Sequence, residues 1–175
     1  MSTITENVIQ AIHNFSNLPK EEIKRLLQKT LTIYPKIELK QTRNKNWLVL
    51  TTKNINIKHN NKKYSIGVFK VYINLTRTKK IYNQVEYRNT NKKKIKLGMF
   101  FHPHIIVGRK IQDTISTSGY ACHGNITELL AKMLFNGNIF AAIKIIDNFL
   151  HSYNEHGIFN RNSRLASKIE LWKEK

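Results

Sequence analysis

The sequence predicts an α+β fold, in which an antiparallel β-meander packs on flanking N-terminal and C-terminal helices. Apolar residues recur with the helical period at both ends of the chain, and with period two between residues 37 and 87. Because helices and strands are segregated along the chain, an alternating α/β fold is not expected. The 175 residues fit a single domain. Its core is expected over about 20–154, with a C-terminal helical extension over 160–175.

Two helices are predicted before the strands. Thr3 and Glu6 have the spacing of a capping box for the first helix. Pro19, at a first helical position, begins the second helix, and Pro35 closes it. The apolar residues that share one face are Val8, Ile9, Ile12 and Phe15 in the first helix, and Ile23, Leu26, Leu27 and Leu31 in the second.

Five strands are predicted near residues 37–40, 47–51, 55–58, 64–75 and 81–87. In the longest of them the apolar residues Phe69, Val71, Ile73 and Leu75 alternate with Lys70, Tyr72 and Asn74. This alternation predicts one face in the core and one face in water. The stretch His59-Asn60-Asn61 predicts a turn, because Asn tolerates the left-handed conformation. Residues 89–96 contain little apolar material, which predicts a solvated loop.

The helical period returns after an irregular segment that spans residues 102–125. Asn125 and Glu128 are expected to cap a helix from Ile126 to Phe135, with Leu129, Leu130 and Met133 facing inward. A break at Asn136-Gly137-Asn138 precedes a longer helix from Ile139 to about Tyr153, with Ile143, Ile146, Phe149 and Leu150 on its buried side. Ser163 is expected to cap a last helix that carries Leu165, Ile169 and Trp172.

The composition indicates a cytoplasmic protein without metal or disulfide staples. Cys122 is the single cysteine, so an intrachain disulfide is excluded and a reducing compartment is expected. The first ten residues lack a basic cluster ahead of an apolar run, and no stretch approaches eighteen apolar residues. Secretion and membrane spanning are therefore not expected.

The formal net charge of +19 indicates a polyanionic partner such as nucleic acid. Glu86 is the only acidic residue between Gln41 and Gln112, so the basic excess lies in the middle of the chain. The abundance of Asn, Ile and Lys also fits an AT-rich coding sequence, so part of the charge has a compositional explanation. The candidate contacts for nucleic acid or an acidic partner are Lys62, Lys63, Lys79, Lys80, Lys92, Lys93 and Lys94. The tyrosines Tyr64, Tyr72, Tyr82 and Tyr87 could stack bases or simply pack across strands.

Two short motifs suggest chemistry at a thiol. The motif His102-Pro103-His104 is followed by Gly119-Tyr120-Ala121-Cys122-His123-Gly124-Asn125. A thiol just ahead of a helix N-terminus, near imidazoles, is favoured as thiolate, which is the nucleophilic form. His102, His104, Cys122 and His123 could also fill four zinc positions. Their spacing matches no zinc finger, so no metal and no cofactor are predicted.

The order of these motifs resembles the ubiquitin-conjugating enzyme family and its prokaryotic and viral relatives of the same fold. That family places a helix first, then a meander, a His-Pro-Asn motif, the thioester cysteine and further helices. The resemblance implies that Cys122 is the thioester cysteine, with His102 in the motif and His104 in place of the family's Asn. It extends from about Glu21 to Tyr153.

Three functions remain open from the sequence. A catalytically silent relative that acts as a binding module is the first. A thioester carrier of a ubiquitin-like modifier, with Cys122 as nucleophile, is the second. A basic nucleic-acid-binding protein is the third. No Gly-rich phosphate loop and no carboxylate cluster is present, which argues against phosphoryl transfer and acid/base hydrolysis.

Overall fold

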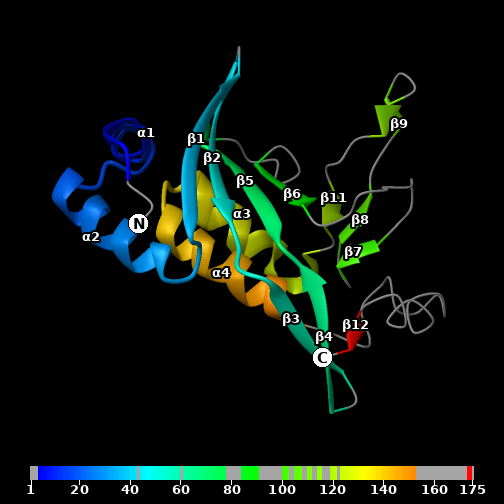
Figure 1. Ribbon diagram of the computed structural model, residues 1–175. Helices are drawn as coiled ribbons and strands as arrows, with labels where there is room; N and C mark the ends of the chain where they lie inside the picture. The colour runs from blue at the N-terminus through cyan, green and yellow to red at the C-terminus, as the bar shows by residue number, and fades with distance from the viewer. Residues whose placement is uncertain are drawn as a thin grey trace.

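Helices flank a sheet in the computed structural model (Figure 1), which describes residues 4–42, 44–59, 61–77, 84–90, 100–102, 105–107, 110–111, 114–115, 119–121, 123–152 and 173–174. The α-helices in this part of the chain are α1 (Glu6–Ser16), α2 (Lys20–Leu31), α3 (Thr127–Phe135) and α4 (Ile139–His151). The strands are β1 (Lys36–Thr42), β2 (Lys45–Thr51), β3 (Ile55–His59), β4 (Lys62–Gly67), β5 (Phe69–Asn74), β6 (Val85–Asn89), β7 (Phe100–His102), β8 (Ile105–Val107), β9 (Lys110–Ile111), β10 (Thr114–Ile115), β11 (Gly119–Ala121) and β12 (Lys173–Glu174).

Seven of these strands form one sheet in the order β1-β2-β5-β6-β11-β8-β7, and every neighbouring pair in it is antiparallel. Strands β3 and β4 pair with β12 in a second sheet, and β9 pairs with β10. The predicted α+β class is therefore confirmed. The segment predicted as irregular, residues 102–125, instead adds strands to the main sheet, because β8 and β11 lie between β6 and β7.

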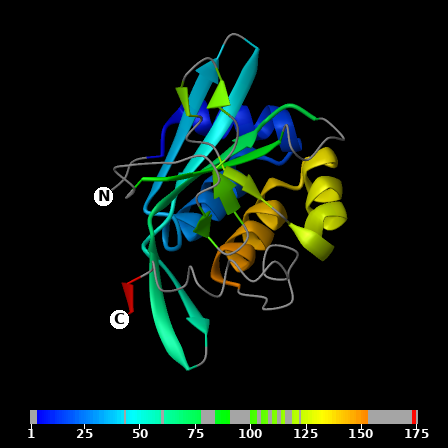
Figure 2. The same cartoon turned by 90° about the vertical axis from the view of Figure 1, so that its right-hand side faces the viewer.

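A long bent ribbon links the two larger sheets. Its first arm is β2 followed by β3, and its second arm is β4 followed by β5. At the bend the Thr52 N–H donates to the Phe69 carbonyl at 2.9 Å, and the Phe69 N–H donates to the Thr52 hydroxyl at 2.9 Å. Gly67 has φ 110°, a conformation that a side chain would oppose. The strand predicted over 64–75 is thus two strands with a break at residue 68, and the β3–β4 end extends beyond the helices (Figure 2).

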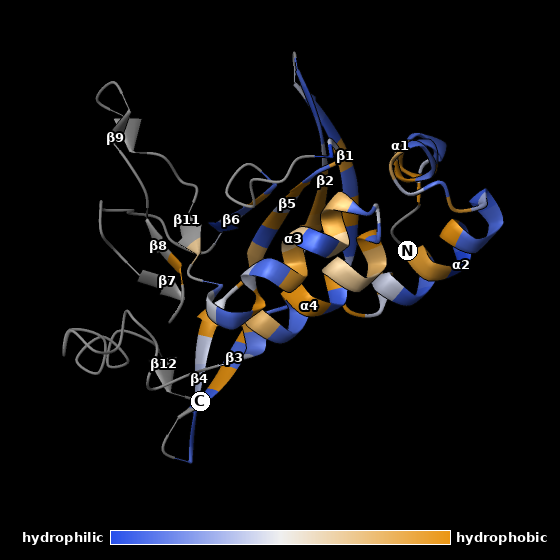
Figure 3. Ribbon diagram, turned by 180° about the vertical axis from the view of Figure 1, so that it is seen from behind, coloured by the Kyte–Doolittle hydropathy of each residue, from blue (hydrophilic) through white to orange (hydrophobic). Residues whose placement is uncertain are grey.

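The main core lies between one face of the sheet, named here the inner face, and the helices. Seen from behind, α3 and α4 lie over β1, β2 and β5 (Figure 3), and their buried residues are apolar. Fully buried inner-face side chains are Leu48, Leu50, Phe69, Val71 and Ile73, in one cluster with residues of all four helices. Each such burial stabilises the fold by about 1.5–3 kcal/mol before the entropy of ordering is counted.

The helix starts differ from the predictions. Helix α1 begins at Glu6 with Thr5 as its N-cap, and no side chain makes a capping hydrogen bond there, so the predicted capping box of Thr3 is wrong. Pro19 is the N-cap of α2 and not its first helical residue. A 3₁₀ turn over residues 124–126 precedes α3, whose first residue Thr127 donates a hydrogen bond to the Gly124 carbonyl at 2.9 Å. The N-cap of α3 is Ile126, and no side-chain hydrogen bond caps the helix there. The predicted cap by Asn125 is therefore also wrong.

The turn between α3 and α4 confirms the predicted break. Gly137 has φ 76°, and its N–H donates to the Leu134 carbonyl at 3.1 Å. The Asn138 N–H donates to the Met133 carbonyl at 2.8 Å, which completes a Schellman motif. On α3, Leu130 is fully buried, but Leu129 is 48% exposed, so the prediction that Leu129 faces inward is wrong.

The last part of the predicted architecture falls outside the described residues. Most of the helical extension expected over 160–175 belongs to residues 153–172, but its end is predicted wrongly, because Lys173 and Glu174 form strand β12 against β4. Most of the loop expected over 89–96 belongs to residues 91–99. Asn89 itself is the last residue of β6, is buried, and donates from its side-chain amide to the Ile66 carbonyl at 3.0 Å. Asn61 has φ 60°, which confirms the predicted left-handed turn between β3 and β4.

Candidate nucleic-acid interface

The face of the sheet opposite the helices, named here the outer face, is not uniformly polar. Because side chains alternate along a strand, the register places Lys40, Trp47 and Tyr72 on this face. Tyr72 is only 6% exposed and Asn74 only 3%, so the prediction that this face of β5 lies in water is wrong. Trp47, Val49 and Tyr72 form a small second apolar cluster.

Cations cover the two aromatic rings of this cluster. The rings of Trp47 and Tyr72 meet edge to face, with centroids 6.4 Å apart. The Arg88 guanidinium lies 4.4 Å and the Lys40 ammonium 5.6 Å from the centre of the Tyr72 ring, and the Lys45 ammonium lies 5.2 Å from that of Trp47. Such contacts hold Lys40 and Lys45 on an aromatic surface without an acidic partner among the described residues, whereas Arg88 also pairs with Glu86 at 3.4 Å. The outer face is therefore basic, with its aromatic rings beneath the cations.

The end of the β3–β4 hairpin is the most basic described part of the ribbon. The register pairs Lys58 with Lys63 and His59 with Lys62. Lys58, Lys62 and Lys63 are all exposed, and neither Lys58 nor Lys63 forms an ion pair with any described residue. Of the two predicted contacts in β4, Lys63 therefore shares a face with Lys58, whereas Lys62 projects from the opposite face of the hairpin. The other five candidates, Lys79, Lys80, Lys92, Lys93 and Lys94, lie outside the described residues.

A polar row connects this basic end to the rest of the outer face. The Asn54 amide donates to the Ser65 hydroxyl at 2.8 Å and to the Asn56 side-chain oxygen at 3.2 Å. Asn56 pairs with Ser65 on the same face as Lys58 and Lys63. From β2 to β3 the first arm of the ribbon spans residues 45–59. At about 3.3 Å per residue, the polar and basic track is roughly 45 Å long.

The described tyrosines among those that could either stack bases or pack across strands are packed. Tyr64 is 9% exposed and Tyr87 is fully buried. Tyr82 lies outside the described residues. The rings of Tyr87 and Phe149 lie 5.7 Å apart. Tyr64, Tyr72 and Tyr87 therefore pack across strands or in the core, which is the second of the two alternatives.

The two motif segments of the predicted thiol site meet across one strand. His102 of β7 and Ala121 of β11 both pair with Ile105 of β8, which is fully buried. Since neighbouring strands are about 4.8 Å apart, the backbones of His102 and Ala121 lie about 10 Å from each other. Pro103, His104 and Cys122 lie outside the described residues, as does the side chain of His102.

His123, the residue after the cysteine, is anchored to the core. The Tyr87 hydroxyl and His123 Nε2 share a hydrogen bond of 2.8 Å, and the rings of His123 and Phe149 lie 4.9 Å apart. Burial, with a smaller contribution from Tyr34, raises the pKa of Tyr87 well above its ordinary value. The phenol therefore stays protonated at neutral pH and keeps this hydrogen bond, which holds the start of the turn before α3 against β6. No pattern in the sequence indicated this contact, because the two residues are 36 positions apart.

Neither a metal centre nor a membrane helix is found within the described ranges. No three His, Cys, Asp or Glu side chains there lie close enough together to hold a metal ion. None of the described helices is long and apolar enough to span a bilayer. Comparison with protein-family models, with curated proteins and with solved structures yields no match.

Proposed function

We propose that this protein is a non-catalytic binding module that holds duplex nucleic acid along the outer face of its long ribbon. The observation that supports this most is the pairing of Lys58 with Lys63 at the exposed end of the hairpin. Like charges directly opposite each other destabilise a sheet. A phosphate group between the two ammonium groups would replace this repulsion by attraction, and the release of counterions would drive binding.

The burial of the aromatic residues favours a duplex over a single strand. Binding of single strands depends on exposed rings on which bases stack. Trp47 and Tyr72 are less than 10% exposed and lie beneath cations, so they offer no stacking platform. A two-stranded ribbon with a basic end fits the width of the major groove, where phosphate contacts position it. We therefore expect weak sequence preference.

Removing the two paired lysines tests this proposal. Lys58→Ala with Lys63→Ala should weaken binding to a 20-base-pair duplex uniformly across sequences. The slope of log affinity against log salt should fall by about two, because about 0.9 counterions are released per duplex phosphate contact. Fluorescence anisotropy over a series of salt concentrations measures both quantities. A 20-nucleotide single strand should bind more weakly than the duplex to the unaltered protein.

A matched variant separates local contact from net charge. Lys29 on α2 and Lys132 on α3 are exposed and lie on helices, away from the outer face. Lys29→Ala with Lys132→Ala removes the same total charge and should leave the salt slope within error of the unaltered protein. Equal losses in both double variants, or a flat salt dependence throughout, would sink the proposed interface.

The second candidate function is thioester chemistry at Cys122. We propose it together with the fold of the ubiquitin-conjugating enzyme family, on which it depends. The pairing of His102 and Ala121 with the same residue, Ile105, supports it, because His102 begins the motif and Ala121 directly precedes the cysteine in the sequence. A transfer site would need the thiol exposed and its pKa lowered. Because Cys122 is the single cysteine, mass spectrometry after alkylation reports on it alone.

Alkylation of Cys122 distinguishes the two candidates. A carrier should react with iodoacetamide at pH 7 on the order of tenfold faster than a free thiol of ordinary pKa. A binding module should react no faster than that reference, and Cys122→Ser should retain its affinity for the duplex. Loss of duplex binding in Cys122→Ser would contradict the separation of the two functions.

A further inference from the structure

Strand β1 ends the seven-stranded sheet, so one of its edges has no sheet partner among the strands that the structure describes. The Leu75 N–H donates to the Asn46 carbonyl at 2.8 Å, so the backbone of Asn46 faces β5. Along an antiparallel strand the backbone N–H and C=O groups of successive residues point alternately to the strand on one side and to the strand on the other. The backbone groups of the odd-numbered residues of β2 therefore bond to β1. The register pairs these with the even-numbered residues of β1. The N–H and C=O groups of Ile37, Leu39 and Gln41 consequently point away from the sheet.

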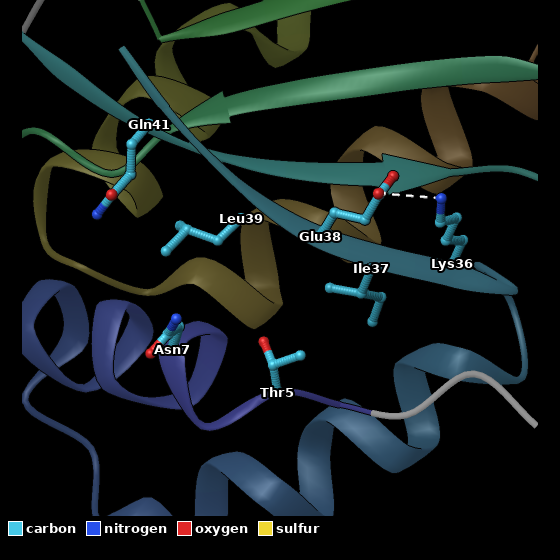
Figure 4. Close-up of a pocket in the computed structure, with 7 residues that line it drawn as sticks. All are labelled: Thr5, Asn7, Lys36, Ile37, Glu38, Leu39 and Gln41. Atoms are coloured by element: carbon cyan, nitrogen blue, oxygen red, sulfur yellow. Dashed lines mark ion pairs between the residues drawn. The ribbon is translucent and has the colours of Figure 1, made fainter. Parts of the chain in front are cut away.

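A cavity of about 390 Å³ lies along this edge (Figure 4). Its lining consists of Thr5, Asn7, Lys36, Ile37, Glu38, Leu39 and Gln41. All three residues with outward backbone groups are among them, and the polar side chains of Thr5 and Asn7 come from the start of α1. The cavity therefore offers backbone donors and acceptors in a row, which is what an added strand uses.

We propose that this cavity binds an extended peptide of a partner protein, which adds a strand to β1. A strand occupies about 3.4 by 4.8 by 10 Å per residue, or about 160 Å³. The cavity thus holds two to three residues of such a segment, and the flanking residues continue along β1. This binding goes beyond the proposed contact with nucleic acid and uses the edge of β1, which borders the outer face, instead of the end of the β3–β4 hairpin.

The charges on β1 specify the partner segment. Lys36, Glu38 and Lys40 project from the same face of the strand, because side chains alternate. The Lys36 ammonium and the Glu38 carboxylate lie 3.0 Å apart (Figure 4). A segment with the pattern acid, polar, base, polar, acid places an opposite charge across from each of the three. The pattern reads the same in both directions, so parallel and antiparallel pairing match it equally.

Two short peptides test this surface. The probe is acetyl-Glu-Thr-Lys-Thr-Glu-amide, and the control, acetyl-Lys-Thr-Glu-Thr-Lys-amide, has each charge reversed. The probe should bind on the order of tenfold more tightly, since three opposite-charge pairs replace three like-charge pairs. In amide hydrogen exchange followed by NMR, the probe should slow exchange at Ile37, Leu39 and Gln41. Exchange at Lys36, Glu38 and Lys40, already bonded to β2, should not change.

Three variants make the outcome decisive. Glu38→Lys leaves only positive charges at positions 36, 38 and 40. This variant should therefore bind acetyl-Glu-Thr-Glu-Thr-Glu-amide more tightly than the probe. Gln41→Pro removes one outward backbone N–H, and the side chain of Gln41 is exposed. This variant should bind the probe more weakly and should keep the far-ultraviolet circular dichroism of the unaltered protein. Lys58→Ala with Lys63→Ala should leave probe binding unchanged. Equal affinity for both peptides, or protection confined to the β3–β4 hairpin, would overturn the proposal.

Discussion

Leu130→Ala should lower the free energy of unfolding by about 2–5 kcal/mol, whereas Leu129→Ala should change it by less than about 0.5 kcal/mol. The two leucines are neighbours on α3, and the substitution is the same at both positions. Leu130 is fully buried in the main core, and its truncation removes apolar contact and leaves a cavity. Leu129 is 48% exposed, so its truncation removes little contact.

Urea denaturation followed by circular dichroism measures both changes. Alanine has the higher helix propensity of the two residues, so the helix itself is not weakened by either substitution. Leu129 therefore controls for every effect except burial. Similar losses at both positions would mean that α3 is rotated about its axis relative to the core described above.

Gly137→Ala should be the more destabilising of two glycine substitutions, with a loss of at least about 2 kcal/mol. Gly137 has φ 76°, and a Cβ at this position would lie 2.7 Å from the Phe15 carbonyl oxygen. That oxygen also accepts hydrogen bonds from the Arg77 guanidinium, at 2.8 Å from Nη2 and 3.3 Å from Nε. The added methyl group would push apart the end of α1 and the turn after α3.

Gly124→Ala provides the matched comparison. Gly124 also has a positive φ, 56°, but a Cβ there would meet no atom within 4 Å. It should therefore show only the cost of the left-handed conformation, about 1 kcal/mol. Thermal unfolding of the two variants measures the difference, which isolates the contact with Phe15. Equal losses would indicate that the turn after α3 opens without strain.

Local patterns were sufficient for the elements with a clear period. The apolar face of α4, with Ile143, Ile146 and Leu150, is buried as the helical period predicted. The turn at Asn61 and the break at Gly137 also follow from residue types that adopt positive φ. By contrast, the caps at Thr3 and Asn125 were predicted wrongly. A capping pattern identifies residues that are able to cap, but the packing of the helix decides where it begins.

The candidate interface was only partly visible in the sequence. The charge distribution pointed to Lys62 and Lys63, because charge is a property of composition. The third lysine of the hairpin end, Lys58, is identified by the register that pairs it with Lys63. The cations over Trp47 and Tyr72 come from β1, β2 and β6, which are separate in the sequence.

The sequence by itself determined the α+β class, the periods of the helices and of the strands between residues 37 and 87, the basic middle and the single cysteine, since each depends on residues close together in the chain. Only the tertiary structure decided that β8 and β11 lie between β6 and β7, that β1 is an outermost strand of the seven-stranded sheet, and that His123 meets Tyr87. These arrangements depend on pairing between distant strands. The period of two is the same for every possible pairing, so it specifies which side chains share a face but not which strands are neighbours.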